Sequence, residues 1–224
     1  MKRNPNEIIR REIAFPVSLR VREAQEGEAT SRRIEGYAIL FNTPSAPFYK
    51  DETGEIREII APEAVTKELL DGSDIKMTMF HDRQLILARS NMGAGTLSYE
   101  IDDKGVRFAF DAPETVDGDK ALALVRRGDL AGCSFCFSTR YYDESCVSHD
   151  VAKQNGYTIE TYTVRSMTGV YDFTITDNPA YPATSVEARE LAESLREPEV
   201  KPGTSIEYRE QVAEMRRAAR TISV

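Results

Sequence analysis

Residues 96–110 read TLSYEIDDKGVRFAF, and this stretch indicates the class of fold most directly. Apolar and polar residues alternate through 96–101 and again through 106–110. Alternation with a period of two predicts strands that bury one face. The connection at 102–105, DDKG, has the length and the glycine that suit a β-hairpin. We therefore expect two antiparallel strands here.

Further strands and a few short helices are expected on both sides of this hairpin. Strand patterns recur in five other segments, at 34–41, 75–80, 130–142, 157–164 and 169–176. Proline suits the first turn of a short helix at 62–70, and Gly128 suits the end of a second helix at 119–127. The pattern predicts an α+β domain that is mainly β.

The composition of the 224-residue chain excludes several classes of protein. It holds 29 Lys and Arg against 37 Asp and Glu, and this net charge of −8 excludes a generic basic nucleic-acid binder. No apolar run approaches the roughly 18 residues of a membrane span, and the charged N-terminus lacks the apolar segment of a secretory signal. Three cysteines make no disulfide framework. We expect a soluble intracellular protein with no nucleic-acid and no membrane partner.

Changes in composition divide the chain into three parts. Residues 1–32 are charged and have little to bury, which predicts a mobile arm around one strand near 15–21. Residues 33–189 hold the strand patterns and form one domain. Residues 190–224 predict a helical tail, in which a linker with proline and glycine at 197–203 separates two helices.

Two side chains are candidates for proton transfer and nucleophilic attack. His81 directly follows the predicted strand at 75–80, and an imidazole can take or give a proton at neutral pH. Ser134 lies in a strand of small and aromatic residues, and a serine hydroxyl becomes a nucleophile when an imidazole removes its proton. Each residue taken singly also fits a structural role, because buried hydroxyls find backbone partners and single histidines are common on surfaces.

Asp172 differs in kind from the many other carboxylates. It alternates with aromatic and β-branched residues in the predicted strand at 169–176. On a buried face its charge would need a cation or an imidazole as partner, whereas on a wet face it would need none. Both interpretations stay open from the residues alone.

Cys133, Cys136, Cys146 and His149 imitate the spacing of a four-ligand zinc site. Against this interpretation, residues three apart in a strand project to opposite faces, and the two residues between the first cysteines are not turn formers. A redox role for the C-x-x-C pair would require the cysteines to open a helix, which the pattern does not predict.

Several motifs occur in an order that resembles one protein family. They are EGYAILFN at 35–42, EIIAPEAV at 58–65, FHD at 80–82, LARS at 87–90, GDLAGCSFCF at 128–137 and VYDFTITDNPAYP at 170–182. In this order they resemble the serine proteases of tailed phages and prophages that mature proheads, which are relatives of the herpesvirus assembly proteases. The resemblance spans residues 33–189.

The resemblance implies a catalytic site and a fold. His81 and Ser134 match the catalytic histidine and the nucleophile, and Asp172 becomes the third member. His149 is the alternative third member, because the herpesvirus relatives use a second histidine. The implied fold is an antiparallel β-barrel flanked by short helices, with a helical C-terminal tail. Neither a cofactor nor a metal is expected.

The resemblance also implies partners and a place of action. The implied substrates are the major capsid protein with its scaffolding segment, any separate scaffold, and the protease's own tails, all cut inside the assembling prohead in the host bacterial cytoplasm. An oxyanion hole of backbone N–H groups is required, with Arg89 or Arg165 as candidate helpers. The oligomeric state stays open, a homo-oligomer included. Two other functions stay open as well, a non-catalytic capsid-assembly scaffold protein and a zinc-binding interaction module.

Overall fold

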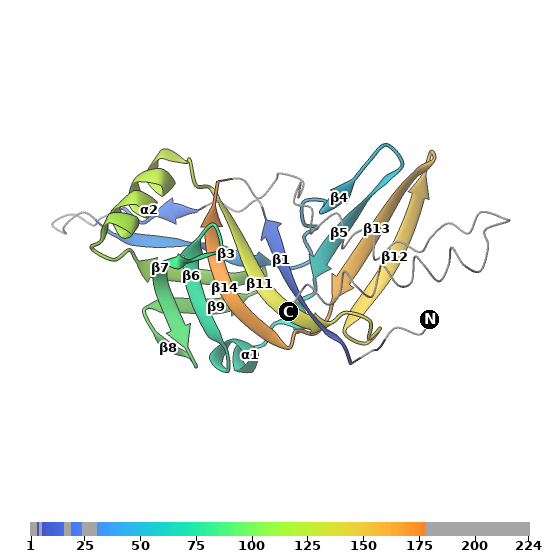
Figure 1. Ribbon diagram of the computed structural model, residues 1–224, viewed down its shortest axis with the longest axis horizontal. Coiled ribbons are helices and arrows are strands. Elements are labelled where there is room, and N and C mark those ends of the chain that lie inside the picture. The colour runs from blue at the N-terminus through green and yellow to red at the C-terminus, as the bar shows by residue number, and fades with distance from the viewer. Residues whose placement is uncertain (1–3, 5, 16–18, 24–30, 178–224) are drawn as a thin grey trace.

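Strands dominate the computed structural model, which describes residues 4, 6–15, 19–23 and 31–177. These residues form three β-sheets, two α-helices and one short 3-10 helix. In Figure 1, helix α2 lies at one end of the molecule, and the sheet that contains β12, β13, β5 and β4 stands at the other end. The largest sheet runs between them.

The largest sheet has six strands in the order β1-β11-β14-β6-β7-β8. Strand β14 lies inside this sheet, where it pairs antiparallel with β11 and parallel with β6. It therefore joins segments that are far apart in the chain. The bounds of the six strands are β1 Ile8–Phe15, β11 Gly132–Arg140, β14 Gly169–Thr176, β6 Asp74–Met79, β7 Asp82–Asn91 and β8 Ala94–Gly95.

The two smaller sheets have four strands each. One has the order β2-β3-β10-β9, with bounds Arg20–Val21, Arg33–Leu40, Gly105–Asp111 and Leu97–Asp102. The other has the order β12-β13-β5-β4, with bounds Val147–Gln154, Tyr157–Val164, Gly54–Ile60 and Tyr49–Lys50. The predicted hairpin is confirmed as β9 and β10, which pair antiparallel with Gly105 opposite Asp102. A glycine is needed there, because a Cβ on Gly105 would lie 1.9 Å from the carbonyl oxygen of Ile39.

The sheets differ from the antiparallel barrel that we expected. Over the described residues, each of the three sheets has two edge strands, and none closes on itself. Two of the pairings, β14 with β6 and β13 with β5, are parallel. The alternation of side chains along a strand determines which face is buried, but it does not determine which strand lies alongside. Closure and direction therefore could not be inferred from the alternation.

The two α-helices are short, and each begins at a threonine whose side chain caps it. The predicted helix at 62–70 is divided into a 3-10 helix (Pro62–Ala64) and α1 (Lys67–Asp71), because Thr66 is extended and its hydroxyl accepts the N–H of Leu69. The predicted helix at 119–127 is α2 (Val116–Arg127), which ends at Gly128 in the left-handed conformation. The predicted helical tail lies outside the described residues. Within the part of the chain that the structure describes, no helix has the length and apolar character to cross a bilayer.

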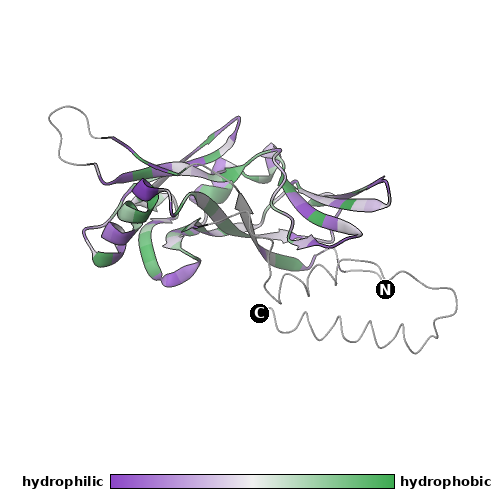
Figure 2. Cartoon of the chain, turned by 90° about the horizontal axis from the view of Figure 1, so that it is seen from above, coloured by the Kyte–Doolittle hydropathy of each residue, from purple (hydrophilic) through white to green (hydrophobic). Residues whose placement is uncertain are grey.

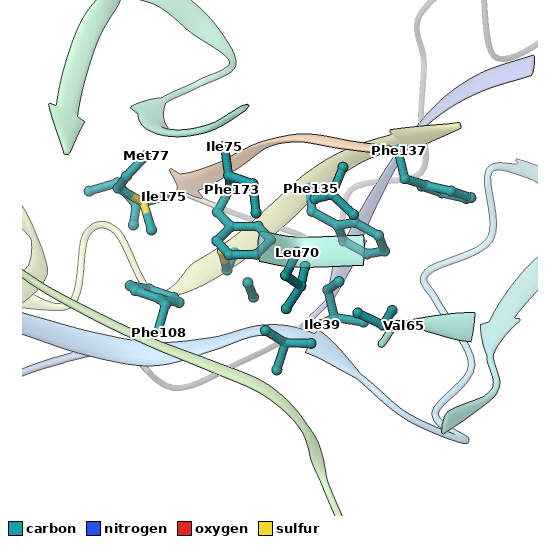
Figure 3. Close-up of a cluster of buried hydrophobic side chains, with 14 of the residues drawn as sticks. Ile39, Val65, Leu70, Ile75, Met77, Phe108, Phe135, Phe137, Phe173 and Ile175 are labelled. Carbon is teal, nitrogen blue, oxygen red and sulfur yellow. The ribbon is translucent and has the colours of Figure 1, made fainter. Parts of the chain in front are cut away.

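The core lies between the six-stranded sheet and the β3–β10 layer. Figure 3 shows Phe135 and Phe173 pointing from the large sheet toward Ile39 and Phe108. All four side chains are buried, and the rings of Phe108 and Phe173 have centroids 6.4 Å apart. Hydrophobic and hydrophilic residues are interleaved along the strands in Figure 2, as expected for strands that bury one face. The core therefore fixes which face of the large sheet is left for polar groups.

Part of the predicted mobile arm is a strand. Residues of β1 pair antiparallel with β11 along its whole length, from Ile8 opposite Arg140 to Phe15 opposite Cys133. Arg11 of β1 lies 2.6 Å from Glu58 of β5, and both side chains are buried. The guanidinium also lies over the ring of Phe48, 4.6 Å from its centroid. This ion pair ties the first strand of the large sheet to the β12–β4 sheet.

Replacement of Arg11 by methionine tests this ion pair. Burial raises the pKa of Glu58, and Arg11 opposes that shift. We expect Arg11→Met to lower the free energy of unfolding at neutral pH by about 3–5 kcal/mol, because a buried carboxylate loses its cation. A carboxyl with a raised pKa in the folded state stabilises the fold at acid pH, and that contribution is lost as the pH rises. The loss should therefore be smaller in mildly acid urea titrations than in neutral ones.

Two control variants make the test specific. Lys50→Met removes an exposed cation from the same small sheet and should change the stability by less than about 1 kcal/mol. Arg11→Met combined with Glu58→Leu removes both charges and should recover most of the loss. A double variant as unstable as Arg11→Met alone would show that packing by the arginine side chain, and not its charge, stabilises this region.

Candidate active site

Three of the residues predicted from the sequence meet at one point of the large sheet. The Nδ1 atom of His81 lies 2.8 Å from Oδ1 of Asp172, and its Nε2 atom lies 2.9 Å from Oγ of Ser134. His81 is 53 residues from Ser134 and 91 residues from Asp172 in the chain. The structure thus brings together side chains from β11, β14 and the β6–β7 turn.

The register of the sheet puts the serine and the carboxylate on the same face. Ser134 of β11 lies opposite Thr174 of β14, and Cys136 lies opposite Asp172. Because side chains alternate along a strand, these four residues share the face opposite to the apolar core. Phe173, between Asp172 and Thr174, points into that core.

His81 reaches the other two residues from a tight turn. Met79 pairs with Asp82, so Phe80 and His81 are the two central residues of the β6–β7 hairpin. Both have positive φ angles, of 57° and 56°, as in the type I′ turns that favour Asn-Gly. A residue with a side chain in this conformation costs about 1–2 kcal/mol. The strain is located at the residue that supplies the imidazole.

Two hydrogen bonds to β14 hold this turn. The N–H of Phe80 donates to the carbonyl oxygen of Ile175 at 3.2 Å, and the N–H of His81 donates to Oγ1 of Thr174 at 2.9 Å. Each contributes about 1 kcal/mol to stability, so together they offset much of the conformational cost. Thr174 was missed by the sequence analysis. Its only signal there is that it occupies the same face as Asp172, two residues away.

The site is largely shielded from water. The side chains of Asp172 and His81 are 8% and 22% exposed, and Ser134 is buried. A buried carboxylate needs a partner, and the imidazole supplies it. A carboxylate at Nδ1 favours the neutral tautomer in which Nδ1–H donates to Asp172 and Nε2 accepts the Ser134 hydroxyl. In this arrangement the imidazole is oriented to take a proton from the serine.

The two arginines that we named as helpers for an oxyanion hole are each paired with a carboxylate. Arg89 donates through Nε and Nη2 to Asp74, at 2.7 and 2.9 Å. Hydrogen bonds from Arg89 and from Lys76 hold the pKa of the Asp74 carboxyl well below its usual range. Arg165 donates to Glu63 at 3.4 Å.

The residues of the zinc hypothesis lie in different environments. Cys133 and Cys136 are three residues apart in β11 and project to opposite faces, and burial raises the pKa of the Cys133 thiol. His149 lies in β12 of another sheet, where its ring stacks on Tyr162 at 4.2 Å and its Nε2 lies 3.1 Å from Glu160. No group of three or more potential ligands for a metal ion is found among the described residues.

His149 was also the alternative third member of the catalytic site. The structure does not bring it to His81, because it lies in the β12–β13 hairpin. The Nδ1 position of His81 is taken by Asp172. The geometry thus favours Asp172 over His149.

A histidine between a serine hydroxyl and a carboxylate is the constellation of triad-type serine hydrolases, which geometry defines and chain order does not. Residues 17–197 match the family described as caudovirus prohead serine protease. The chain therefore belongs to this family of phage serine proteases, and the resemblance seen in the sequence motifs is confirmed.

Among solved structures, the chain is similar to the capsid assembly protease gp21 of bacteriophage T4. The two share 12% sequence identity, with a TM-score of 0.39, and the similarity covers 74% of this chain and 99% of that chain. No curated protein matches the chain.

Metal analysis of the purified protein tests the zinc hypothesis directly. We expect far less than one zinc per chain by mass spectrometry, and no change in the thermal unfolding midpoint after treatment with a chelator, because no three potential ligands come together among the described residues. Cys146→Ser serves as a matched variant, and its metal content should equal that of the wild type. About one zinc per chain, lost in Cys146→Ser, would instead support a metal-binding module.

Proposed function

We propose that this protein is a serine endopeptidase that cleaves capsid and scaffold segments, and its own tails, during maturation of a phage prohead. The observation that carries the proposal is the position of the His81 ring, between the Ser134 hydroxyl at 2.9 Å and the Asp172 carboxylate at 2.8 Å. Membership of a prohead serine protease family supports the same assignment.

The proposed reaction is peptide-bond hydrolysis through an acyl-enzyme. Oγ of Ser134 attacks the scissile carbonyl carbon while Nε2 of His81 takes the hydroxyl proton. The resulting imidazolium is stabilised by the Asp172 carboxylate at Nδ1. The tetrahedral intermediate then collapses, the C–N bond breaks, and His81 returns the proton to the leaving amine.

Water then hydrolyses the acyl-enzyme, and His81 again acts first as a base and then as an acid. A water molecule gives a proton to Nε2 of His81 and its oxygen attacks the ester carbonyl. Collapse of the second tetrahedral intermediate breaks the bond to Oγ of Ser134, and the hydroxyl recovers its proton from His81. The peptide carboxylate leaves, and the site returns to its starting state.

The proposed substrates are extended segments of proteins that build the prohead. A protease needs an unpaired backbone at the cut, which β1 (Ile8–Phe15) does not offer while it is paired with β11. We place self-cleavage within residues 1–32 or 190–224, which include the linker at 197–203. The proposed place of action is the interior of the assembling prohead, in the cytoplasm of the host bacterium.

Replacement of Ser134 by alanine tests three points together: whether Ser134 is the nucleophile, whether the chain is a protease, and whether the capsid protein is its substrate. Wild type and Ser134→Ala are expressed alone and with the cognate capsid protein, and their intact masses are measured. We expect truncation of the wild-type chain or processing of the capsid protein, and neither in Ser134→Ala, because the attacking oxygen is missing.

Ser138→Ala is the matched control for this experiment. Ser138 is another buried serine on the same face of β11, and its hydroxyl contacts Thr168 and Tyr171. Ser138→Ala should therefore still cleave. Identical fragments from wild type and Ser134→Ala would remove Ser134 as the nucleophile, and uncut chains in every sample would favour the non-catalytic assembly protein.

Replacement of Asp172 by asparagine tests the role of the carboxylate. The amide has nearly the same shape, but its NH₂ group would donate to Nδ1 and favour the tautomer with a proton on Nε2, which cannot accept the serine proton. We expect kcat to fall by about 10³- to 10⁴-fold while the chain stays folded. Asp74→Asn alters an exposed carboxylate of the same sheet and should leave kcat nearly unchanged. An Asp172→Asn variant with wild-type kcat would exclude Asp172 as the third member.

A further inference from the structure

We propose that Thr174 is a positioning residue for this reaction, because its hydroxyl holds the backbone of His81 where the imidazole reaches Ser134. The inference rests on the proposed function and adds a fourth residue to it. Thr174 is not assigned a contact with the substrate, so its effect is exerted through His81.

Thr174 lies at the meeting point of the three elements that supply the site. It is completely buried in β14, with Ser134 of β11 opposite on one side and Thr78 of β6 opposite on the other. It is two residues from Asp172 and faces the same side of the sheet. Thr174 is therefore a backbone neighbour of Ser134 and Asp172, and its side chain contacts the backbone of His81.

The hydroxyl oxygen of Thr174 accepts two hydrogen bonds. One comes from the N–H of His81 and the other from the hydroxyl of Thr78, each at 2.9 Å. A hydroxyl oxygen has two lone pairs, so both are used and the direction of the side chain is set. Thr78, also completely buried, holds Thr174 in the orientation that receives the His81 amide.

The turn at Phe80 and His81 makes this hydrogen bond important. Both residues have positive φ angles and neither is glycine, so the turn has a tendency to relax toward other conformations. The bond to Ile175 fixes the amide of Phe80, whereas the bond to Thr174 fixes the amide of the residue that carries the imidazole. Loss of the second bond would let the ring drift from Ser134.

A general base that is displaced by up to about one ångström slows the chemical step more than it weakens substrate binding. We therefore expect Thr174→Val, which removes the hydroxyl but keeps the shape, to lower kcat about 10- to 100-fold with KM changed by less than about threefold. Thr174→Ser keeps the hydroxyl and should retain kcat within about threefold. Thr78→Val removes only the supporting donor and should have an intermediate effect.

The assay uses the full-length chain and a peptide that spans a cleavage site located by intact mass.

A second measurement does not depend on activity. The chain has two histidines, so in a His149→Gln background the downfield proton resonance of Nδ1–H belongs to His81 alone. That resonance should be present in the parent and in Thr174→Ser, and shifted or lost in Thr174→Val.

The outcomes separate this inference from the proposed function. If the wild type shows no Ser134-dependent cleavage, the proposed function fails, and the resonance alone decides whether Thr174 positions His81. If the wild type cleaves and Thr174→Val has wild-type kcat and resonance, the inference is overturned while the function stands. A lower unfolding temperature of Thr174→Val with unchanged kcat would show that Thr174 has a structural role only. If kcat fell as much in Thr174→Ser as in Thr174→Val, the methyl group and not the hydroxyl would matter, and the inference would be overturned. Should Thr174→Val fail to fold, Thr174→Ala provides the same test.

Discussion

The pairing of β14 with β11 and with β6 is the constraint on which the rest of the structure depends. Side chains of β14 alternate between an apolar core on one face, with Phe173 and Ile175, and a polar face, with Asp172 and Thr174. A shift of the register by one residue would exchange the two faces and drive the carboxylate into the core. Packing of the phenylalanines therefore determines the site as well as the stability, because it specifies the register.

Polar groups on the other face are buried as deeply as the core. Thr78 and Thr174 are 0% exposed, and their hydroxyls bond to each other. Buried hydroxyls destabilise a protein unless they form hydrogen bonds, and the bond between Thr78 and Thr174 avoids that cost. Thr174 also accepts the N–H of His81, in a turn whose positive φ angles most residues avoid. The hydrogen bonds around His81 thus help to offset the backbone strain of its turn.

Local features of this fold were predictable, and long-range ones were not. The patterns at 96–110 and 169–176 predicted strands correctly, although only β9 shows burial that repeats every two residues, while β10 and β14 bury residues on both faces. Strand β12 was missed, since most of its side chains are exposed and show no alternation. His81, Ser134 and Asp172 were named as candidates from their residue types and strand positions, and motifs in family order joined them into one candidate site. Thr174 was not found, because its role depends on the register of β14 against strands distant in the chain.

The first strand constrains how a peptide can approach the site. Around Ser134 the backbone of β11 is paired on both sides, with β1 at Ala14 and with β14 at Thr174. A peptide that joined the sheet at β11 would have to displace β1, and this would withdraw Arg11 from buried Glu58. Breaking a buried ion pair on one side costs several kcal/mol, which is more than a few new strand hydrogen bonds return. With β1 in place, access to the Ser134 hydroxyl is therefore from the polar face of the sheet, where His81 and Asp172 already lie.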